Sequence, residues 1–173
     1  MIPPPPLSDG VVTLRPPDEN DLAAIERGLQ DADVIAAFGR ATDTARGLLQ
    51  LNTERWRRGD AATFTICDDA DRCIGHVFVN LGADRRGTVG YWLLPEARGR
   101  GCAARAVRLV SRWAYEELDV ARLGLLAAAS NRASQRVAEL AGFVREGVLR
   151  SYAEVDGGRE DYVCYSLLPD EVR

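Results

Sequence analysis

The chain has 173 residues, of which 46% are hydrophobic and 28% are charged, and its formal net charge is −4. This length and composition predict one folded domain and exclude a largely disordered chain, and the acidic balance argues against nucleic acid or an anionic membrane as the partner. The four cysteines form no Cys-x-x-Cys pair and there is one histidine, so we expect no metal site, reduced thiols and a cytoplasmic location.

The chain begins MIPPPPLSDG, with four consecutive prolines and neither the basic nor the apolar segment of a signal peptide. This stretch predicts a stiff, poorly ordered polyproline lead-in at residues 1–10. One domain is expected at residues 11–168, followed by a short tail at residues 169–173. No apolar run approaches the roughly 18 residues of a membrane span, so we expect no membrane partner.

One strand and three helices are expected in the first third of the chain. The strand covers residues 11–16 and ends at two prolines. Asp18, with Asp21 three residues later, predicts a capping box at the start of the first helix, and residues 34–38 and 44–58 predict two more helices. Trp56 on the third helix fits either the core or the substrate side, and the sequence leaves that choice open.

The hydrophobic period then changes from that of helices to that of strands. Residues 62–67, 73–81 and 88–94 are expected to form an antiparallel meander. A helix follows from about residue 102, and its buried face is marked by Ala103, Val107, Val110, Ala114 and Leu118. Residues 123–129 are apolar throughout, which is typical of a buried strand paired in parallel with the strand before the helix.

The last third of the chain predicts a helix and a hairpin. The stretch SNRASQRVAELAGF is expected to be helical, with Val137, Leu140 and Ala141 facing inward and Gly142 just past its end. Strands at residues 144–155 and 159–168 are joined by Asp-Gly-Gly, which is a strong hairpin signal. The predicted order of elements is that of a mixed α/β domain.

The stretch PEARGRGCAARAV, residues 95–107, places two glycines and three arginines between a strand and a helix. Amides at a helix start have no intrahelical partner and carry partial positive charge, and glycine lets the backbone approach a ligand closely. The pattern therefore predicts a cradle for a phosphate or pyrophosphate, with a plain strand-to-helix turn as the alternative. It lacks the Gly-Lys-Ser/Thr of a nucleotide P-loop and the placement of a dinucleotide-binding motif.

Three ordered blocks resemble the GNAT acetyltransferases, and specifically their RimJ/RimL branch. Residues 98–103, RGRGCA, fit the R/Q-x-x-G-x-G/A signature within GYWLLPEARGRG, and NRASQRVAELAGFVREG and VDGGREDYVCYSLL follow. The resemblance covers residues 11–168. It implies the GNAT fold, an α/β arrangement with a central, mixed but mostly antiparallel sheet of about seven strands and helices on both faces. It also implies that strand 88–94 splays from strand 123–129.

The resemblance implies acetyl-CoA as the cosubstrate, and it assigns each part of that molecule to a segment of this chain. The pyrophosphate would rest on Arg98, Gly99, Arg100, Gly101, Cys102 and Ala103. The pantetheine arm would lie along Trp92, Leu93 and Leu94. The second motif helix would contribute Asn131 to the arm and Ser134 to the sulfur.

Acyl transfer to an amine needs oxyanion donors, a proton acceptor and a group that protonates the leaving thiolate. The resemblance implies that Ser134 gives a proton to the thiolate, and backbone amides near Leu93 are the expected oxyanion donors. Some relatives carry a glutamate base after the second motif helix. Glu154 is the nearest acid here, although a gapless reading places Ala153 at that position. His76 and water remain alternative bases, and Asp161 is expected to bond backbone near the hairpin.

We therefore expect an acetyl-CoA-dependent N-acetyltransferase that modifies a primary amine, either a protein N-terminus or a small molecule, within a ternary complex. The acceptor site is expected between the helices of residues 18–58 and the C-terminal hairpin, including Tyr152. The alternative from another class is a non-catalytic module that binds or senses acyl-CoA. The oligomeric state is left open, and a homodimer is among its possibilities.

Overall fold

The computed structural model describes residues 4–39, 42, 44–155 and 157–172. Three helices precede the central strands: α1 (Leu22–Gln30), α2 (Ala32–Phe38) and α3 (Ala45–Arg58). Asp18 forms the predicted capping box with Asp21, but it opens a 3₁₀ turn, Glu19–Asp21, that runs directly into α1. Helix α3 is capped at its start by Thr44 and ends at Gly59, as the sequence predicts.

Eight strands form one sheet in the order β1-β2-β3-β4-β5-β6-β8-β7. Their bounds are β1 (Leu7–Ser8), β2 (Thr13–Arg15), β3 (Ala61–Cys67), β4 (Cys73–Leu81), β5 (Arg86–Leu93), β6 (Arg122–Ala128), β7 (Val144–Val155) and β8 (Gly158–Leu167). Every neighbouring pair is antiparallel except β5 and β6, which are parallel. The predicted mixed, mostly antiparallel GNAT sheet is confirmed.

The sheet has one strand more than the expected seven, because part of the proline-rich lead-in joins it. Leu7 pairs with Leu14, and its side chain packs against the hydrophobic core. At the other end of the chain, Pro169–Glu171 form a 3₁₀ turn and Val172 also packs against the core. Both segments that the sequence places outside the domain therefore contribute to it.

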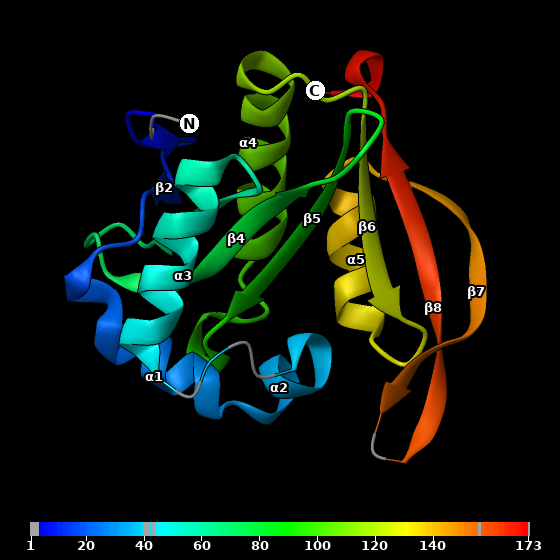
Figure 1. Ribbon diagram of the computed structural model, residues 1–173, viewed down its shortest axis with the longest axis horizontal. Helices are drawn as coiled ribbons and strands as arrows, with labels where there is room; N and C mark the ends of the chain where they lie inside the picture. Colours follow the sequence, from blue (N-terminus) through cyan, green and yellow to red (C-terminus); the bar gives the residue numbers. More distant parts are fainter. Residues whose placement is uncertain (1–3, 40–41, 43, 156, 173) are drawn as a thin grey trace.

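Helices cover both faces of the sheet, as predicted. Helices α1, α2 and α3 lie on one face, and α4 (Cys102–Glu117) and α5 (Arg132–Leu140) lie on the other (Figure 1). We call these the α1–α3 face and the α4/α5 face. The core between the sheet and α4 contains Phe64, Val107 and Trp113. Trp56 packs on Phe64 and Trp113, with ring centroids 5.1 and 5.9 Å away, so it belongs to the core.

One inward assignment on α5 is wrong. Leu140 is 46% exposed, whereas Ala138 and Ala141 are buried. The nine-residue helix turns its buried stripe through Gln135 and Ala138, which leaves Leu140 on the outer side. Gly142 follows the C-cap with φ +95°, as expected for the residue after a helix end. The predicted hairpin turn includes Asp156, which lies outside the described residues.

Candidate active site

The loop before α4 has the backbone geometry of an anion cradle. Gly99 and Gly101 have φ values of +73° and +79°, and Gly101 is the N-cap of α4 without a side-chain cap. A Cβ at either glycine would meet nothing within 4 Å, so the left-handed backbone, rather than lack of space, is what favours glycine there. The first amides of α4 have no intrahelical partner and lie at the positive end of the helix dipole.

Strands β5 and β6 diverge, which confirms the predicted splay. Their pairing runs only from Arg86↔Arg122 to Thr88↔Gly124. Beyond Thr88, β5 continues to Leu93 and β6 to Ala128 without pairing to each other. Between the separated strands lies a groove of about 780 Å³, which we call the splay groove. Its size is in the range of small-molecule sites.

The splay groove passes from one face of the sheet to the other, as strand alternation shows. On β5, Gly90 faces Phe38 of α2, whereas Tyr91 reaches Ser134 of α5. On β8, Leu167 points toward Gly142 and the α4/α5 face. Glu160 and Tyr162 have the opposite parity and so lie on the α1–α3 face. The groove therefore offers a separate approach from each face.

Ser134 is held in place by two hydrogen bonds on the α4/α5 face. The Tyr91 hydroxyl donates to Ser134 Oγ at 3.2 Å. Asn131 caps α5 by accepting the Ser134 amide at 2.9 Å, which confirms its capping role. Gln135 donates to the carbonyls of Ala128 and Ala129 and so ties the helix start to β6. Burial raises the pKa of Tyr91, which keeps its hydroxyl protonated.

Arg98 has a set of partners that the sequence did not predict. Its guanidinium donates to Asp31 at 2.7 Å, to Asp33 at 2.6 Å and to the Leu93 carbonyl at 3.0 Å. Its backbone amide donates to Pro95. Arg98 therefore ties α2 to the end of β5 instead of presenting a free cation to phosphate. Arg100, in contrast, is exposed beside the two glycines.

Seven of the predicted cofactor-contact residues line the splay groove: Trp92, Leu93, Arg98, Gly99, Ala103, Asn131 and Ser134. Leu94 is buried beyond the end of β5 and does not line it, and its amide bonds the Ile74 carbonyl. Arg100, Gly101 and Cys102 are also outside the lining and continue the loop into the first turn of α4.

The acids do not lie where the sequence suggests. Glu154 is exposed on β7 and does not line the splay groove, whereas Asp33 of α2 and Glu160 of β8, neither of which was a predicted base, do. Asp161 accepts the Ser151 amide at 2.7 Å, which confirms its expected structural role. Strand parity after the Asp-Gly-Gly turn is the one signal that could have drawn attention to Glu160, because it places Glu160 and Tyr162 on one face.

His76 lies away from the splay groove. It is buried, its ring centroid is 4.9 Å from that of Trp92, and its Nε2 has no hydrogen-bond partner among the described residues. Burial lowers the pKa of His76 to about 4. The imidazole is therefore neutral near pH 7, but it does not face the groove in which a base is needed.

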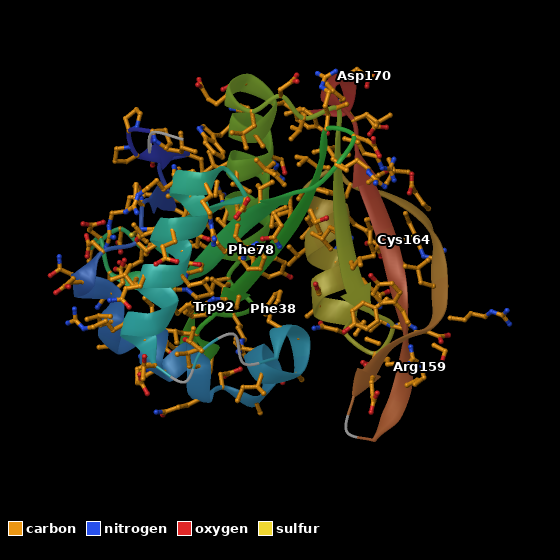
Figure 2. All side chains as sticks on the ribbon, in the orientation of Figure 1. Phe38, Phe78, Trp92, Arg159, Cys164 and Asp170 are labelled. Atoms are coloured by element: carbon orange, nitrogen blue, oxygen red, sulfur yellow. The ribbon has the colours of Figure 1, made fainter. Side chains whose placement is uncertain are left out.

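Aromatic side chains line the groove on the α1–α3 face. Phe38 of α2 and Phe78 of β4 meet edge to face, with ring centroids 5.4 Å apart (Figure 2). Tyr152 and Tyr162 of the β7–β8 hairpin form a second pair at 5.4 Å. Both pairs belong to the groove lining. Within the described parts of the chain, no group of three or more His, Cys, Asp or Glu residues is arranged to hold a metal ion.

No helix in the described part of the chain is both long and apolar enough to cross a membrane. A helix start preceded by glycines of positive φ, beside a groove between diverging parallel strands, is the arrangement that the GNAT resemblance implies. The family model for the acetyltransferase (GNAT) domain matches residues 12–144, and the chain belongs to this family.

Similarity to individual proteins confirms the resemblance to the RimJ/RimL branch. A Bacillus subtilis protein named "Putative ribosomal N-acetyltransferase YdaF" is 39% identical over 51% of this chain and 48% of its own length. "Probable N-acetyltransferase YjcK" from the same organism is 37% identical over 62% of this chain and 61% of its own length. Each match thus covers less than two thirds of the relative's own length.

A solved structure with the same fold is Mycobacterium smegmatis RimJ in complex with CoA-disulfide. It superimposes with a TM-score of 0.83 over 98% of this chain and 88% of that one, at 24% sequence identity. At this identity the likeness concerns the fold.

Proposed function

We propose that the protein transfers the acetyl group of acetyl-CoA to a primary amine. The observation that carries this proposal is the divergence of β5 and β6 beyond Thr88, which opens a groove running from the start of α4 to Ser134. A thioester on a long, flexible arm needs such a slot between an anion cradle and a reaction centre. The fold shared with a CoA-bound RimJ supports the same ligand.

The parts of acetyl-CoA are assigned to groups of this chain. The amides of the Gly99–Ala103 loop, with Arg100, hold the pyrophosphate. The pantetheine arm lies beside Leu93 and Asn131. Backbone amides of β5 that point away from β4 beyond Thr88 have no strand partner in β6, and those near Leu93 are suited to hydrogen-bond the arm or the thioester oxygen.

The reaction is direct attack in a ternary complex. A primary ammonium first gives up one proton, and the neutral nitrogen then forms a bond to the thioester carbonyl carbon. The carbon–sulfur bond then breaks. The nitrogen loses its second proton and the leaving thiolate gains one, so the step is balanced. Ser134 Oγ, oriented by Tyr91 and Asn131, supplies the proton at sulfur and is reprotonated from the nitrogen or from water.

The acceptor is a protein N-terminus or a small primary amine. The name of YdaF supports the first class. Thiol release from acetyl-CoA, measured with a panel of N-terminal peptides and alkyl amines, tests the proposal, and mass spectrometry locates the acetyl group. Calorimetry with CoA and acetyl-CoA separates binding from turnover. Binding without transfer to any amine would favour a sensing module, and no binding would refute both functions.

A further inference from the structure

Two acids line the splay groove, Asp33 of α2 and Glu160 of β8. Asp33 is already paired with Arg98, whereas Glu160 has no cationic partner among the described residues. Its position on β8 is directly across from Ala153 of β7, and cross-strand partners face the same side of a sheet. Both residues line the groove, whereas Glu154, the next residue on β7, does not. In a gapless reading of the family resemblance, Ala153 takes the place at which some relatives carry a glutamate. In this chain the carboxylate beside that position belongs to Glu160 on the neighbouring strand.

One oxygen of the Glu160 carboxylate accepts hydrogen bonds, and the other is free to accept one. Oε1 accepts the Ser130 amide at 3.1 Å and the Ser130 hydroxyl. Oε2 has no hydrogen-bond partner among the residues that the structure describes. Ser130 follows the end of β6, so this contact fixes Glu160 to the strand that forms the far wall of the groove. The free oxygen is available to an ammonium group.

Hydrogen bonds fix the shape of the β7–β8 hairpin next to Glu160. Ser151 has a positive φ of +54°, and its amide is held by Asp161. Arg159 donates to the carbonyls of Ser151 and Tyr152. The resulting irregularity between Leu149 and Ala153 turns Tyr152 toward the splay groove, where it pairs with Tyr162. Two aromatic rings beside a carboxylate form a favourable setting for an organic cation.

We propose that Glu160 anchors the ammonium of the acceptor and takes its first proton. This assignment rests on the proposed function and adds the residue and the charge state of the substrate: a primary ammonium that enters from the α1–α3 face between the Tyr152–Tyr162 and Phe38–Phe78 pairs. The proton passes from nitrogen to Oε2 and then to solvent. Ser134 acts on the sulfur from the opposite face, so the two proton transfers do not compete for one group.

A structural alternative is that Glu160 serves only to hold the segment between β6 and α5 through Ser130. The substitution Glu160→Gln separates the two roles, because glutamine keeps an acceptor oxygen for Ser130 but neither carries charge nor accepts the proton. Glu154→Gln is the matched variant, since it tests the competing acid one residue from Ala153. Melting temperature and CoA affinity show whether either variant disturbs the fold or the cofactor site.

Each variant is assayed with acetyl-CoA and with two acceptor classes, peptides with a free α-amine and alkyl amines without a peptide. For the acceptors that the wild type uses, we expect E160Q to lower kcat/KM by about 100-fold or more, with CoA affinity unchanged and E154Q close to wild type. The peptide and alkyl amine arms identify the natural source of the ammonium. Titration of the same amine into CoA-saturated protein, which cannot transfer, should show weaker amine binding in E160Q.

The outcomes are distinct. If E160Q transfers the acetyl group as well as the wild type does, or if a comparable loss of kcat/KM occurs in E154Q alone, the assignment of Glu160 is overturned. The proposed function stands in either case. If kcat/KM falls in E160Q and CoA affinity falls by a similar factor, or the melting temperature falls as well, the structural role is supported and the catalytic one is overturned. Absence of transfer by the wild type to any amine removes the proposed function and this assignment together.

Discussion

The Tyr91 hydroxyl donates a 3.2 Å hydrogen bond to Ser134 Oγ and so joins β5 to α5 across the splay groove. Burial raises the pKa of Tyr91, so the phenol remains a donor throughout the neutral range. With its proton directed at Ser134 Oγ, the serine hydroxyl is free to turn its own proton toward the groove. Tyr91 is therefore a positioning residue for the group proposed to protonate the thiolate.

Tyr91→Phe is expected to lower kcat about fivefold, the equivalent of one net hydrogen bond of about 1 kcal/mol, with little change in CoA affinity. Ser134→Ala should lower kcat further, and Tyr91→Phe should have no added effect in that background. Steady-state kinetics on the single and double variants measure the coupling. Tyr115→Phe is a suitable control, because Tyr115 bonds Leu167 and Leu123 outside the groove and its loss should affect stability alone. Strictly additive effects at Tyr91 and Ser134 would contradict the positioning role.

Gly101→Asp is expected to weaken CoA binding by tenfold or more, because a carboxylate at the helix start opposes the phosphates by about 1–2 kcal/mol. The matched control is Gly59→Asp. Gly59 has the same φ of +79°, and a Cβ there also meets nothing within 4 Å, but it caps α3 away from the splay groove. Each variant should lose about 1–2 kcal/mol for a left-handed non-glycine residue, and Gly59→Asp should lose somewhat more, because its carboxylate lies at the negative end of α3. Calorimetry should find normal CoA affinity in Gly59→Asp, and equal affinities in the two variants would argue against the cradle.

Alanine substitutions at Arg98 and Arg100 are expected to have different effects, although the two residues are only two positions apart. Arg98→Ala removes the links to Asp31 and Asp33, and because α2 has no fully buried residue, amide exchange in α2 should accelerate. Arg100→Ala should leave α2 unchanged and reduce CoA affinity roughly tenfold, as for a charge-assisted bond to phosphate, with a weaker dependence on salt. Hydrogen exchange and binding at two ionic strengths test the pair. Faster α2 exchange in Arg100→Ala would reverse the assignment.

His76 is expected to make the protein sensitive to mild acid. Its pKa is about 4 in the folded state, lowered by burial, against about 6.5 in an unfolded chain. Between these values the unfolded state binds the extra proton, so stability is full above pH 6.5 and declines as the pH falls toward 4, by roughly 3 kcal/mol in all. His76→Gln should flatten this part of the profile in urea unfolding experiments. An unchanged slope between pH 6.5 and 4.5 in the variant would show that other groups cause it.

Prediction from sequence succeeded where local pattern alone decides the structure. The helix end before Gly142 and the capping box at Asp18 were predicted, and both follow from short-range geometry. The splay beyond Thr88 was implied by the family resemblance and is confirmed by the strand pairing. Leu140 was misplaced because helical spacing alone does not show which of several apolar residues meets the sheet.

The roles of charged side chains were harder to predict. Arg98 reads as a phosphate ligand until Asp31 and Asp33, more than 60 residues away in sequence, are found beside it. Glu154 is the nearest acid along the chain to the expected base position, but the acids that line the splay groove are Asp33, which is paired with Arg98, and Glu160. Tyr91 was read as part of a motif, and its contact with Ser134 depends on the packing of α5 against β6 and α4, which brings Ser134 within reach of β5.

By itself, the sequence determined the order of helices and strands, the helix start that suits a diphosphate and the family to which the chain belongs, because these depend on spacing between near neighbours. The tertiary structure alone decided which acids face the groove, which arginine is already engaged and which tyrosine supports Ser134. Those outcomes follow from strand register and from the divergence of β5 and β6, which bring together side chains that lie far apart in the chain.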